Sequence, residues 1–276
     1  MNYPDSDVAS TLLKQAAPDL NGRISFAAEN VGTGQRLAFG AENKHATASV
    51  IKLPILVHAL MEVEEGRLSL DTTVTLVEAE KTPGSGILSH LTEGLTIPVR
   101  DVLMLMTIVS DNTATNMMID LLRIEPINAC IRSLGLSVTT LFGKVCTTDR
   151  NIAEENVKYG LGVTTPGEMV DLLKRIASAD LGLTTMQPLL REILSKQFYQ
   201  DCIPRMLPPD HIFEGKSGSV DEVRNDVGIV TTPSEDQIAI AVFADDLTPN
   251  WTTDNPGKIA IGKLSRLLVE KLGEKC

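Results

Sequence analysis

Residues that build metal sites and disulfide frameworks are scarce in this 276-residue sequence. The four cysteines and four histidines lie far apart, and none forms a C-x-x-C, H-x-H or H-x-x-x-H pair. In a chain of this length such cysteines are more typical of free core thiols than of disulfides. Isolated histidines also argue against a zinc site. The sequence therefore predicts a protein without a metal or cofactor.

Positive charge and long apolar runs are also in short supply. The formal net charge of −11 argues against a nucleic-acid or anionic-membrane partner, because both need basic patches. No apolar run approaches the roughly 18–20 residues of a membrane span. The N-terminal MNYPDSDVAS lacks the basic and apolar regions of a secretory signal. We expect a cytoplasmic protein; the alternative is a periplasmic or secreted protein whose signal peptide has been removed. The oligomeric state is not indicated.

The apolar pattern changes its period along the chain. A helical period is found at 6–17, 49–65, 98–109, 113–122, 126–134, 166–177, 188–198 and 257–272. Strand-like alternation is found at 23–30, 34–40, 212–219, 225–232 and 237–245. No repeat or linker interrupts the chain, which favours a single domain over residues 1–276.

Strands at both ends with helices between them predict an α/β (α+β) fold. We expect an antiparallel sheet formed from both chain ends with flanking helices, plus an inserted all-helical subdomain. The α/β part would cover about 1–52 and 210–276, and the all-α part about 53–209. A cleft between the two parts is where a site is expected.

Three short motifs occur in order along this layout. Ser49-x-x-Lys52 starts a predicted helix, Ser110-Asp111-Asn112 lies between two helices, and Lys216-Ser217-Gly218 lies on a predicted strand. From average composition, S-x-x-K is expected about once in such a chain, but SDN and KSG well under ~0.1 times each. The ordered set is therefore a strong signal.

The residue types form a coherent chemical set. A serine hydroxyl becomes a nucleophile when a base takes its proton, and Lys52 shares a helix face with Ser49. Burial or a second cation such as Lys216 would lower the pKa of Lys52. Ser110 could relay a proton to a leaving nitrogen. The backbone N–H groups of Ser49 and Ser219 could form an oxyanion hole.

The motifs resemble those of class A β-lactamases and related penicillin-recognising serine hydrolases. SDNTATNMMID and RNDVGIV extend the resemblance over nearly the whole chain. It implies a β-lactamase/DD-peptidase-like fold, acyl-enzyme chemistry without metal or cofactor, and a small-molecule amide or ester substrate. It also implies the roles of the site residues: nucleophile Ser49, base partner Lys52, proton relay Ser110, binding of the substrate amide by Asn112, and binding of its carboxylate beside Gly218 by Lys216, Ser217 and Arg224.

Several of these residues have a plainer interpretation. Asn112 could simply cap the following helix. Asp111 is expected to hold its loop in place, and Arg224 could be a surface ion-pair partner. The glycine turn at 83–88 is better interpreted as a plain loop than as part of the cleft. A phosphate-binding loop at GKS lacks the required earlier glycine and is rejected.

The sequence departs from the class A pattern in the loop DRNIAEENVKYGLGVTTP. Ile152 stands where the glutamate that activates the deacylating water is expected, and Val163 where an aspartate is expected. Glu154 or Glu155, beside Asn156, could supply a carboxylate by another route, or both could be solvated loop charges. The step that releases the acyl group is therefore open.

Three functions follow from these alternatives. If a glutamate reaches the site, the protein hydrolyses β-lactams, which is the main prediction. If not, it acylates and stalls like a penicillin-binding protein, or acts as an esterase, amidase or DD-peptidase-type hydrolase. The third is a binding module without catalysis, and the intact motifs argue against it because binding alone does not need Lys52 beside Ser49.

Overall fold

Strands from both ends of the chain pair in one sheet. The computed structural model describes residues 5–146, 158–248, 252 and 254–273. Five antiparallel strands lie in the order β2-β1-β10-β9-β8. Their bounds are Arg23–Asn30 (β1), Arg36–Phe39 (β2), Ile212–Val220 (β8), Val223–Thr231 (β9) and Gln237–Asp245 (β10). The predicted mixed fold with an antiparallel sheet from both chain ends is confirmed.

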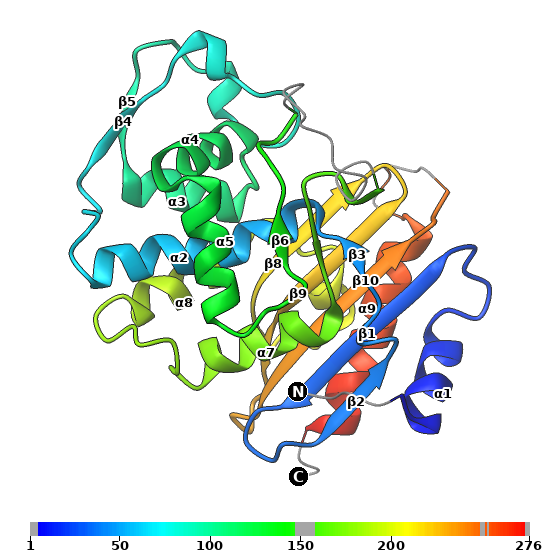
Figure 1. Ribbon diagram of the computed structural model, residues 1–276. Helices are drawn as coiled ribbons and strands as arrows, with labels where there is room; N and C mark the ends of the chain where they lie inside the picture. Colours follow the sequence, from blue (N-terminus) through cyan, green and yellow to red (C-terminus); the bar gives the residue numbers. More distant parts are fainter. Residues whose placement is uncertain (1–4, 147–157, 249–251, 253, 274–276) are drawn as a thin grey trace.

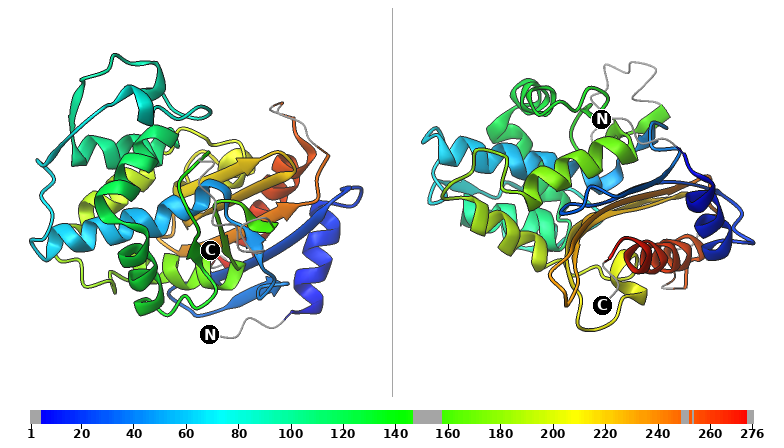
Figure 2. Two further views of the ribbon diagram at one scale, coloured as in Figure 1. Left: turned by 45° about the horizontal axis from the view of Figure 1, so that its top comes forward. Right: turned by 90° about the horizontal axis from the view of Figure 1, so that it is seen from below.

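The three central strands, β1, β10 and β9, are buried at almost every position because both faces of the sheet are covered. Along β10, Ala241 and Phe243 pack into the core on one face, and Ile240 and Val242 into the core on the other. Successive side chains of a strand point to opposite faces, so each strand contributes to two cores. Figure 2 (right) shows the sheet between its two helical layers.

One face of the sheet is covered by the two terminal helices, α1 (Asp7–Ala16) and α9 (Pro256–Leu272). The Ser6 hydroxyl accepts the Ala9 N–H and caps α1. The opposite face is covered by α7 (Pro166–Ala177), which packs on β1, β9 and β10. This helix falls in the range predicted for the all-α part, although its contacts are with the sheet. The division into two parts stays a prediction.

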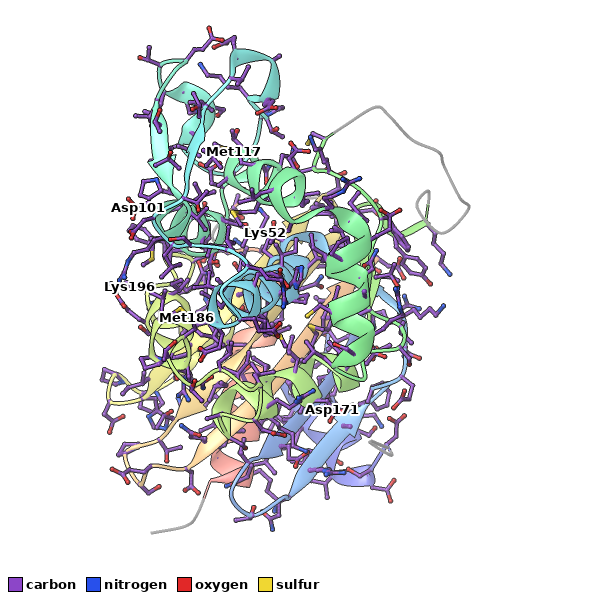
Figure 3. All side chains as sticks on the ribbon, turned by 60° about the vertical axis from the view of Figure 1, so that its left-hand side comes forward. Lys52, Asp101, Met117, Asp171, Met186 and Lys196 are labelled. Carbon is purple, nitrogen blue, oxygen red and sulfur yellow. The ribbon has the colours of Figure 1, made fainter. Side chains whose placement is uncertain are left out.

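The remaining long helices gather beside the sheet (Figure 1). The longest, α2, lies in the interior: nine successive residues, from Lys52 to Leu60, are buried. In Figure 3, Lys52 lies within this helical half, whereas Lys196 lies at its outer edge. The bounds are Lys52–Glu64 (α2), Val99–Ile108 (α3), Asn112–Leu122 (α4), Ile124–Ser133 (α5) and Gln187–Ser195 (α8).

Short elements that the sequence pattern misses join these parts. His45–Ala46 (β3), Thr140–Leu141 (β6) and Gly162–Thr164 (β7) form a small sheet in the order β3-β7-β6, and Thr73–Thr75 (β4) pairs with Thr96–Pro98 (β5). Four short 3-10 turns are η1 Ala48–Ile51, η2 Glu78–Glu80, η3 Leu88–His90 and η4 Ile203–Met206. Two- and three-residue elements are too short to give a periodic signal.

Two local predictions are wrong. Pro98 ends β5 and precedes α3 instead of being its first helical residue. The cysteines were expected in the core, and Cys202 is buried, but Cys146 is exposed. Among the described residues, no helix is both long enough and apolar enough to cross a bilayer.

Candidate active site

Ser49 lies in η1, immediately before α2 begins at Lys52. The Lys52 backbone N–H donates to Ser49 O, so the two residues are held one short turn apart. Ser49 is half-buried. Ala48 has φ 44°, in the left-handed region that is unfavourable for residues other than glycine. Strain beside a half-exposed hydroxyl has to be held by its surroundings, which is common at functional sites.

The strand β8 supplies that support by passing very close to η1. A Cβ at Gly218 would lie 2.9 Å from Ser49 N, Val50 N and Thr47 O. Any side chain larger than glycine would therefore push the strand away from the turn. Asn225, on the neighbouring strand, also donates from Nδ2 to the carbonyls of Ala46 and Thr47, at 2.8 and 3.3 Å. Two strands of the sheet thus fix the backbone on which Ser49 is carried.

Lys52 is fully buried and carries three side-chain hydrogen bonds. Its Nζ donates to Ser110 O at 2.7 Å, Ser110 Oγ at 3.1 Å and Asn112 Oδ1 at 3.0 Å. Among the described residues, no bond to Ser49 Oγ accompanies them. Burial lowers the pKa of Lys52 well below its usual value, and the Lys216 cation lowers it further. The amine therefore gives up its proton more easily than an exposed lysine does.

The segment between α3 and α4 is held by Asp111. Its Oδ1 accepts the Ala114 N–H at 2.9 Å and caps α4, while Oδ2 accepts the N–H groups of Ile87 and Leu88 at 2.6 and 2.8 Å. Asp111, not Asn112, is therefore the helix cap, and its expected role in holding the loop agrees with these contacts. The preceding residue, Ser110, has φ 55° and is buried.

The glycine turn at 83–88 is a loop, as interpreted from the sequence, and it packs directly on this segment. Asn112 Nδ2 donates to Pro83 O at 2.9 Å, and Asn112 N donates to Ser85 O at 3.0 Å. Gly86 has φ 105°, and a Cβ there would lie 2.3–2.4 Å from atoms of Asp111. Glycine is required at this position both for its backbone conformation and for its close approach.

Lys216 is fully buried on β8, and its Nζ donates to Ser217 O at 2.7 Å. Burial lowers the pKa of Lys216 to about 7, against the attraction of Asp226, which raises it. The pKa of Asp226 is itself raised to about 7 by burial, although its Oδ2 accepts the Ile203 N–H. Since the Lys216 charge is felt at Lys52, the first and third motifs meet in space as the sequence predicts.

The structure does not bring Arg224 to these residues. Adjacent strand residues point to opposite faces, and Asn225 faces the Ser49 segment. Arg224 is fully buried on the other face, where Nη1 donates to carbonyls of the β8–β9 turn, at 2.7 Å to Val223 O and 3.0 Å to Asp221 O. The alternative of a surface ion pair is also wrong, because the side chain has no exposed surface.

The predicted deacylation residues Glu154 and Glu155, with Ile152 and Asn156, lie outside the described residues. Asn116, which the sequence motifs do not single out, holds the chain just before this loop. Asn116 donates from Nδ2 to Thr82 Oγ1 and Val145 O, and its Oδ1 accepts the Val145 N–H at 2.8 Å. The position of Asn116 in SDNTATN, four residues after Asn112, was the available signal.

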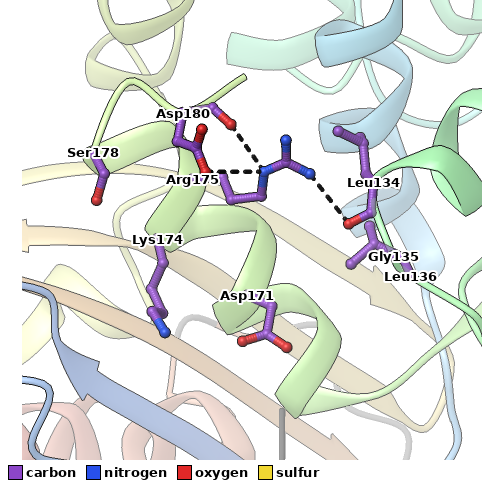
Figure 4. Close-up of a pocket in the computed structure, with 8 residues that line it drawn as sticks. All are labelled: Leu134, Gly135, Leu136, Asp171, Lys174, Arg175, Ser178 and Asp180. Atoms are coloured by element: carbon purple, nitrogen blue, oxygen red, sulfur yellow. Dashed lines mark hydrogen bonds and ion pairs between the residues drawn. The ribbon is translucent and has the colours of Figure 1, made fainter. Parts of the chain in front are cut away.

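A separate hollow of about 330 Å³ lies between α7 and the turn that follows α5 (Figure 4). Its most prominent polar group is Arg175, which donates to Asp180 O at 2.9 Å and Leu134 O at 3.3 Å. The site residues predicted from sequence are absent from its lining. The lining residues are Leu134, Gly135, Leu136, Asp171, Lys174, Arg175, Ser178 and Asp180.

The arrangement around Ser49 combines a half-exposed hydroxyl, a buried amine with a lowered pKa, a second hydroxyl on that amine and a second buried amine. This set suits nucleophilic acyl transfer. Within the described ranges, no three or more His, Cys, Asp or Glu side chains gather as metal ligands.

Comparison with known proteins agrees with this class. The family profile described as "Beta-lactamase enzyme family" matches residues 8–272. A β-lactamase from Streptomyces fradiae is 24% identical over 91% of this chain and 82% of its own length. The β-lactamase structure from Sphaerobacter thermophilus has TM-score 0.85 at 27% identity, covering 96% of this chain and 97% of that one. A leucine-to-glutamate variant of PBP-A, solved as its acyl-enzyme complex with penicillin G, has TM-score 0.84 at 24% identity, covering 96% of each chain.

The fold and the group formed by Ser49, Lys52 and Ser110 define a serine hydrolase of the β-lactamase type. The chain belongs to the Beta-lactamase enzyme family.

Proposed function

We propose that this protein opens β-lactam rings by transferring their acyl group to Ser49, as a class A-like enzyme. The observation that carries the proposal is the buried Lys52 amine, held against Ser110 and one turn from Ser49. A protonated lysine is not a base, but burial and the Lys216 charge both lower the pKa of Lys52. A neutral amine in this position can take the Ser49 proton.

In the acylation step Ser49 Oγ attacks the lactam carbonyl carbon while Lys52 takes its proton. The C–N bond then breaks, and Ser110 gives its hydroxyl proton to the departing nitrogen while it takes one from the Lys52 ammonium. Lys52 ends neutral and Ser49 ends as an ester, so atoms and charges balance. The 3.1 Å bond between Lys52 Nζ and Ser110 Oγ supports this relay.

The other site residues would bind the substrate. The N–H groups of Ser49 and Ser219 would hold the carbonyl oxygen, because Gly218 brings β8 against Ser49 N. Asn112 Nδ2 has two hydrogens and gives one to Pro83 O, which leaves one for a substrate amide. The substrate carboxylate would lie beside Gly218, on Lys216 and Ser217. Arg224 takes no part in this proposal, because it faces away.

Release of the acyl group decides between two outcomes. Ile152 has no carboxylate to activate a water, which favours a long-lived acyl-enzyme, as in a penicillin-binding protein, or turnover only of more reactive esters. Glu154 or Glu155 would restore fast hydrolysis if one of them is the base, and the protein would then confer resistance to a β-lactam antibiotic. PBP-A, whose variant was captured with penicillin G, makes that antibiotic a suitable probe.

The test is to mix the protein with penicillin G or a chromogenic β-lactam and to follow ring opening and intact mass together. Turnover or a stable adduct, either one lost in Ser49→Ala, supports the proposal. Ser195→Ala is the matched control, because this exposed hydroxyl donates only to Glu192 O. Full activity in Ser49→Ala would show that the site assignment is wrong.

The same assay addresses the loop. Glu154→Gln and Glu155→Gln should each be measured for the decay of the acyl-enzyme separately from its formation. A variant that slows decay without slowing formation identifies the base. If both decay as the unaltered protein does, neither carboxylate is the base.

A further inference from the structure

The C-terminal end of α3 is bonded to a distant segment of the chain just before Ser110. Gln197 Nε2 donates to Thr107 O at 3.3 Å, Phe198 N to Ile108 O at 3.1 Å and Tyr199 Oη to Val109 O at 3.4 Å. The last carbonyls of a helix have no partner within it. Here three successive carbonyls are satisfied by residues 197–199, which follow α8.

The Gln197 side chain reaches a second motif as well. Its Nε2 also donates to Gly215 O at 3.4 Å, and Gly215 immediately precedes Lys216 on β8. Its Oε1 accepts the Tyr199 N–H at 3.1 Å. The side chain is 2% exposed. Both hydrogens of one buried amide therefore join the backbone before Ser110 to the backbone before Lys216.

The hydrogen bonds of Gln197 help to hold the backbone at Ser110, which has an unfavourable conformation. Its φ of 55° lies where a serine is stable only when its neighbours hold it. Asp111, the next residue after Ser110, holds the segment between α3 and α4 to the 83–88 turn and to α4 itself. Gln197 is the described side chain that ties the same segment to β8.

We propose that Gln197 is a positioning residue that sets the placement of Ser110 relative to Lys216. It touches neither the substrate nor the reacting atoms. Through the two backbones, it keeps the Ser110 hydroxyl where a leaving nitrogen receives its proton. This inference rests on the proposed function, in which Ser110 delivers that proton.

The effect of misplacing Ser110 should depend on whether the leaving group needs a proton. An amide nitrogen needs a proton as it departs, whereas a 4-nitrophenolate departs as an anion and needs none. Misplacing the Ser110 hydroxyl should therefore slow acylation by penicillin G and leave acylation by 4-nitrophenyl acetate nearly unchanged. A general loss of structure would slow both.

The experiment compares Gln197→Leu with Gln187→Leu. Gln187 is a matched control because its Nε2 also donates to a carbonyl at the end of a helix, Ile176 O of α7, away from both motifs. We expect Gln197→Leu to slow penicillin G acylation by about 10- to 100-fold, as a misplaced general acid does, and the ester by less than about 3-fold. Gln187→Leu should change neither rate by more than about 3-fold.

Equal losses with both substrates, or equal behaviour of the two variants, would overturn the proposal. If Gln197→Leu shows no cooperative thermal melting, Gln197→Glu replaces it, since it keeps the size of the side chain but not the donors. If neither folds, the side chain is a structural one and the proposal is wrong. Failure of the proposed function is seen separately, as the absence of any Ser49 adduct in the unaltered protein.

Discussion

Lys52 Nζ lies 2.7 Å from Ser110 O and 3.1 Å from Ser110 Oγ, and both side chains are buried. The amine is thus bonded to the hydroxyl that would pass on a proton, not to Ser49. In the proposed reaction Lys52 would therefore take part in both proton transfers, from Ser49 and, through Ser110, to the leaving nitrogen.

Replacing Lys52 by arginine should abolish acylation. The guanidinium keeps the positive charge and several donors but does not lose a proton at accessible pH. We expect Lys52→Arg to slow acylation by at least about 10³-fold, within the range for loss of a general base. Intact mass after mixing with penicillin G measures it. The exposed Lys44→Arg is the control, and an active Lys52→Arg would exclude lysine as the base.

Activity on anionic substrates should fall as pH rises above about 7. The Lys216 pKa is lowered to about 7 by burial, so the ammonium is charged below that pH and neutral above it. A substrate carboxylate then loses its counter-ion. The kcat/KM of a β-lactam carboxylate should show this alkaline limb, and that of its methyl ester should not. The same limb with both substrates would contradict the assignment.

Gly218→Ala should disable the site while the protein still folds. The added methyl group would lie 2.9 Å from Ser49 N and Val50 N, so the turn and the strand must separate. We expect acylation to fall by about 10²-fold, the effect of displacing a reacting group by about 1 Å. Gly32→Ala, whose Cβ would meet only Asn30 Oδ1 at 3.5 Å, is the control. The measurements are the acylation rate and the thermal melting of both variants. Equal acylation rates in the two variants would contradict the prediction.

Asp245 should stabilise the fold near neutral pH and not in acid. Burial alone would raise its pKa, but hydrogen bonds from His45 and Arg23 outweigh burial and lower the pKa to about 2. A folded-state pKa below the unfolded one stabilises above about pH 4, and that gain is lost as pH falls toward 2. Asp245→Asn should therefore cost about 2 kcal/mol at pH 7 and nearly nothing at pH 2.

Denaturant unfolding at the two pH values measures this difference. Asp246→Asn is the control, because Asp246 is exposed and lies 4.0 Å from the same Arg23, so its loss should cost under about 0.5 kcal/mol. A pH-independent loss in Asp245→Asn would mean that the carboxylate acts through its shape and not its charge.

The sequence predicts the main chain of this fold well and its supporting contacts poorly. The long elements follow from hydrophobic period, and β8, β9 and β10 lie within two residues of their predicted bounds. The motifs single out Lys52, Ser110 and Asn112, but they do not predict that the Lys52 amine bonds to the other two residues. The contacts of Asp111 with the 83–88 turn do not, because loop-to-loop hydrogen bonds leave no periodic trace.

Arg224 is an example of a strand residue whose side-chain direction could not be predicted from the sequence. The family resemblance implied a carboxylate-binding role, but alternation along β9 turns the side chain to the opposite face from Asn225. Which of two adjacent residues faces the site depends on register with β8 and β10, which is set in three dimensions. Gln197 shows the same limit for a loop, since no pattern in its neighbourhood points to Thr107 or Gly215.

The pairing of β1 with β10 has a consequence for how the protein is made. Arg23 pairs with Asp245, so β1 meets β10 only after the 222 residues that separate this pair have been made. Contacts of such long sequence separation form slowly. Ser49 is synthesised early, yet the strand that presses on it, β8, arrives some 160 residues later, at roughly 5–20 residues per second. Ser49 is therefore made long before the strand that holds its backbone in place, and under the proposed function it would become reactive only after β8 packs against it.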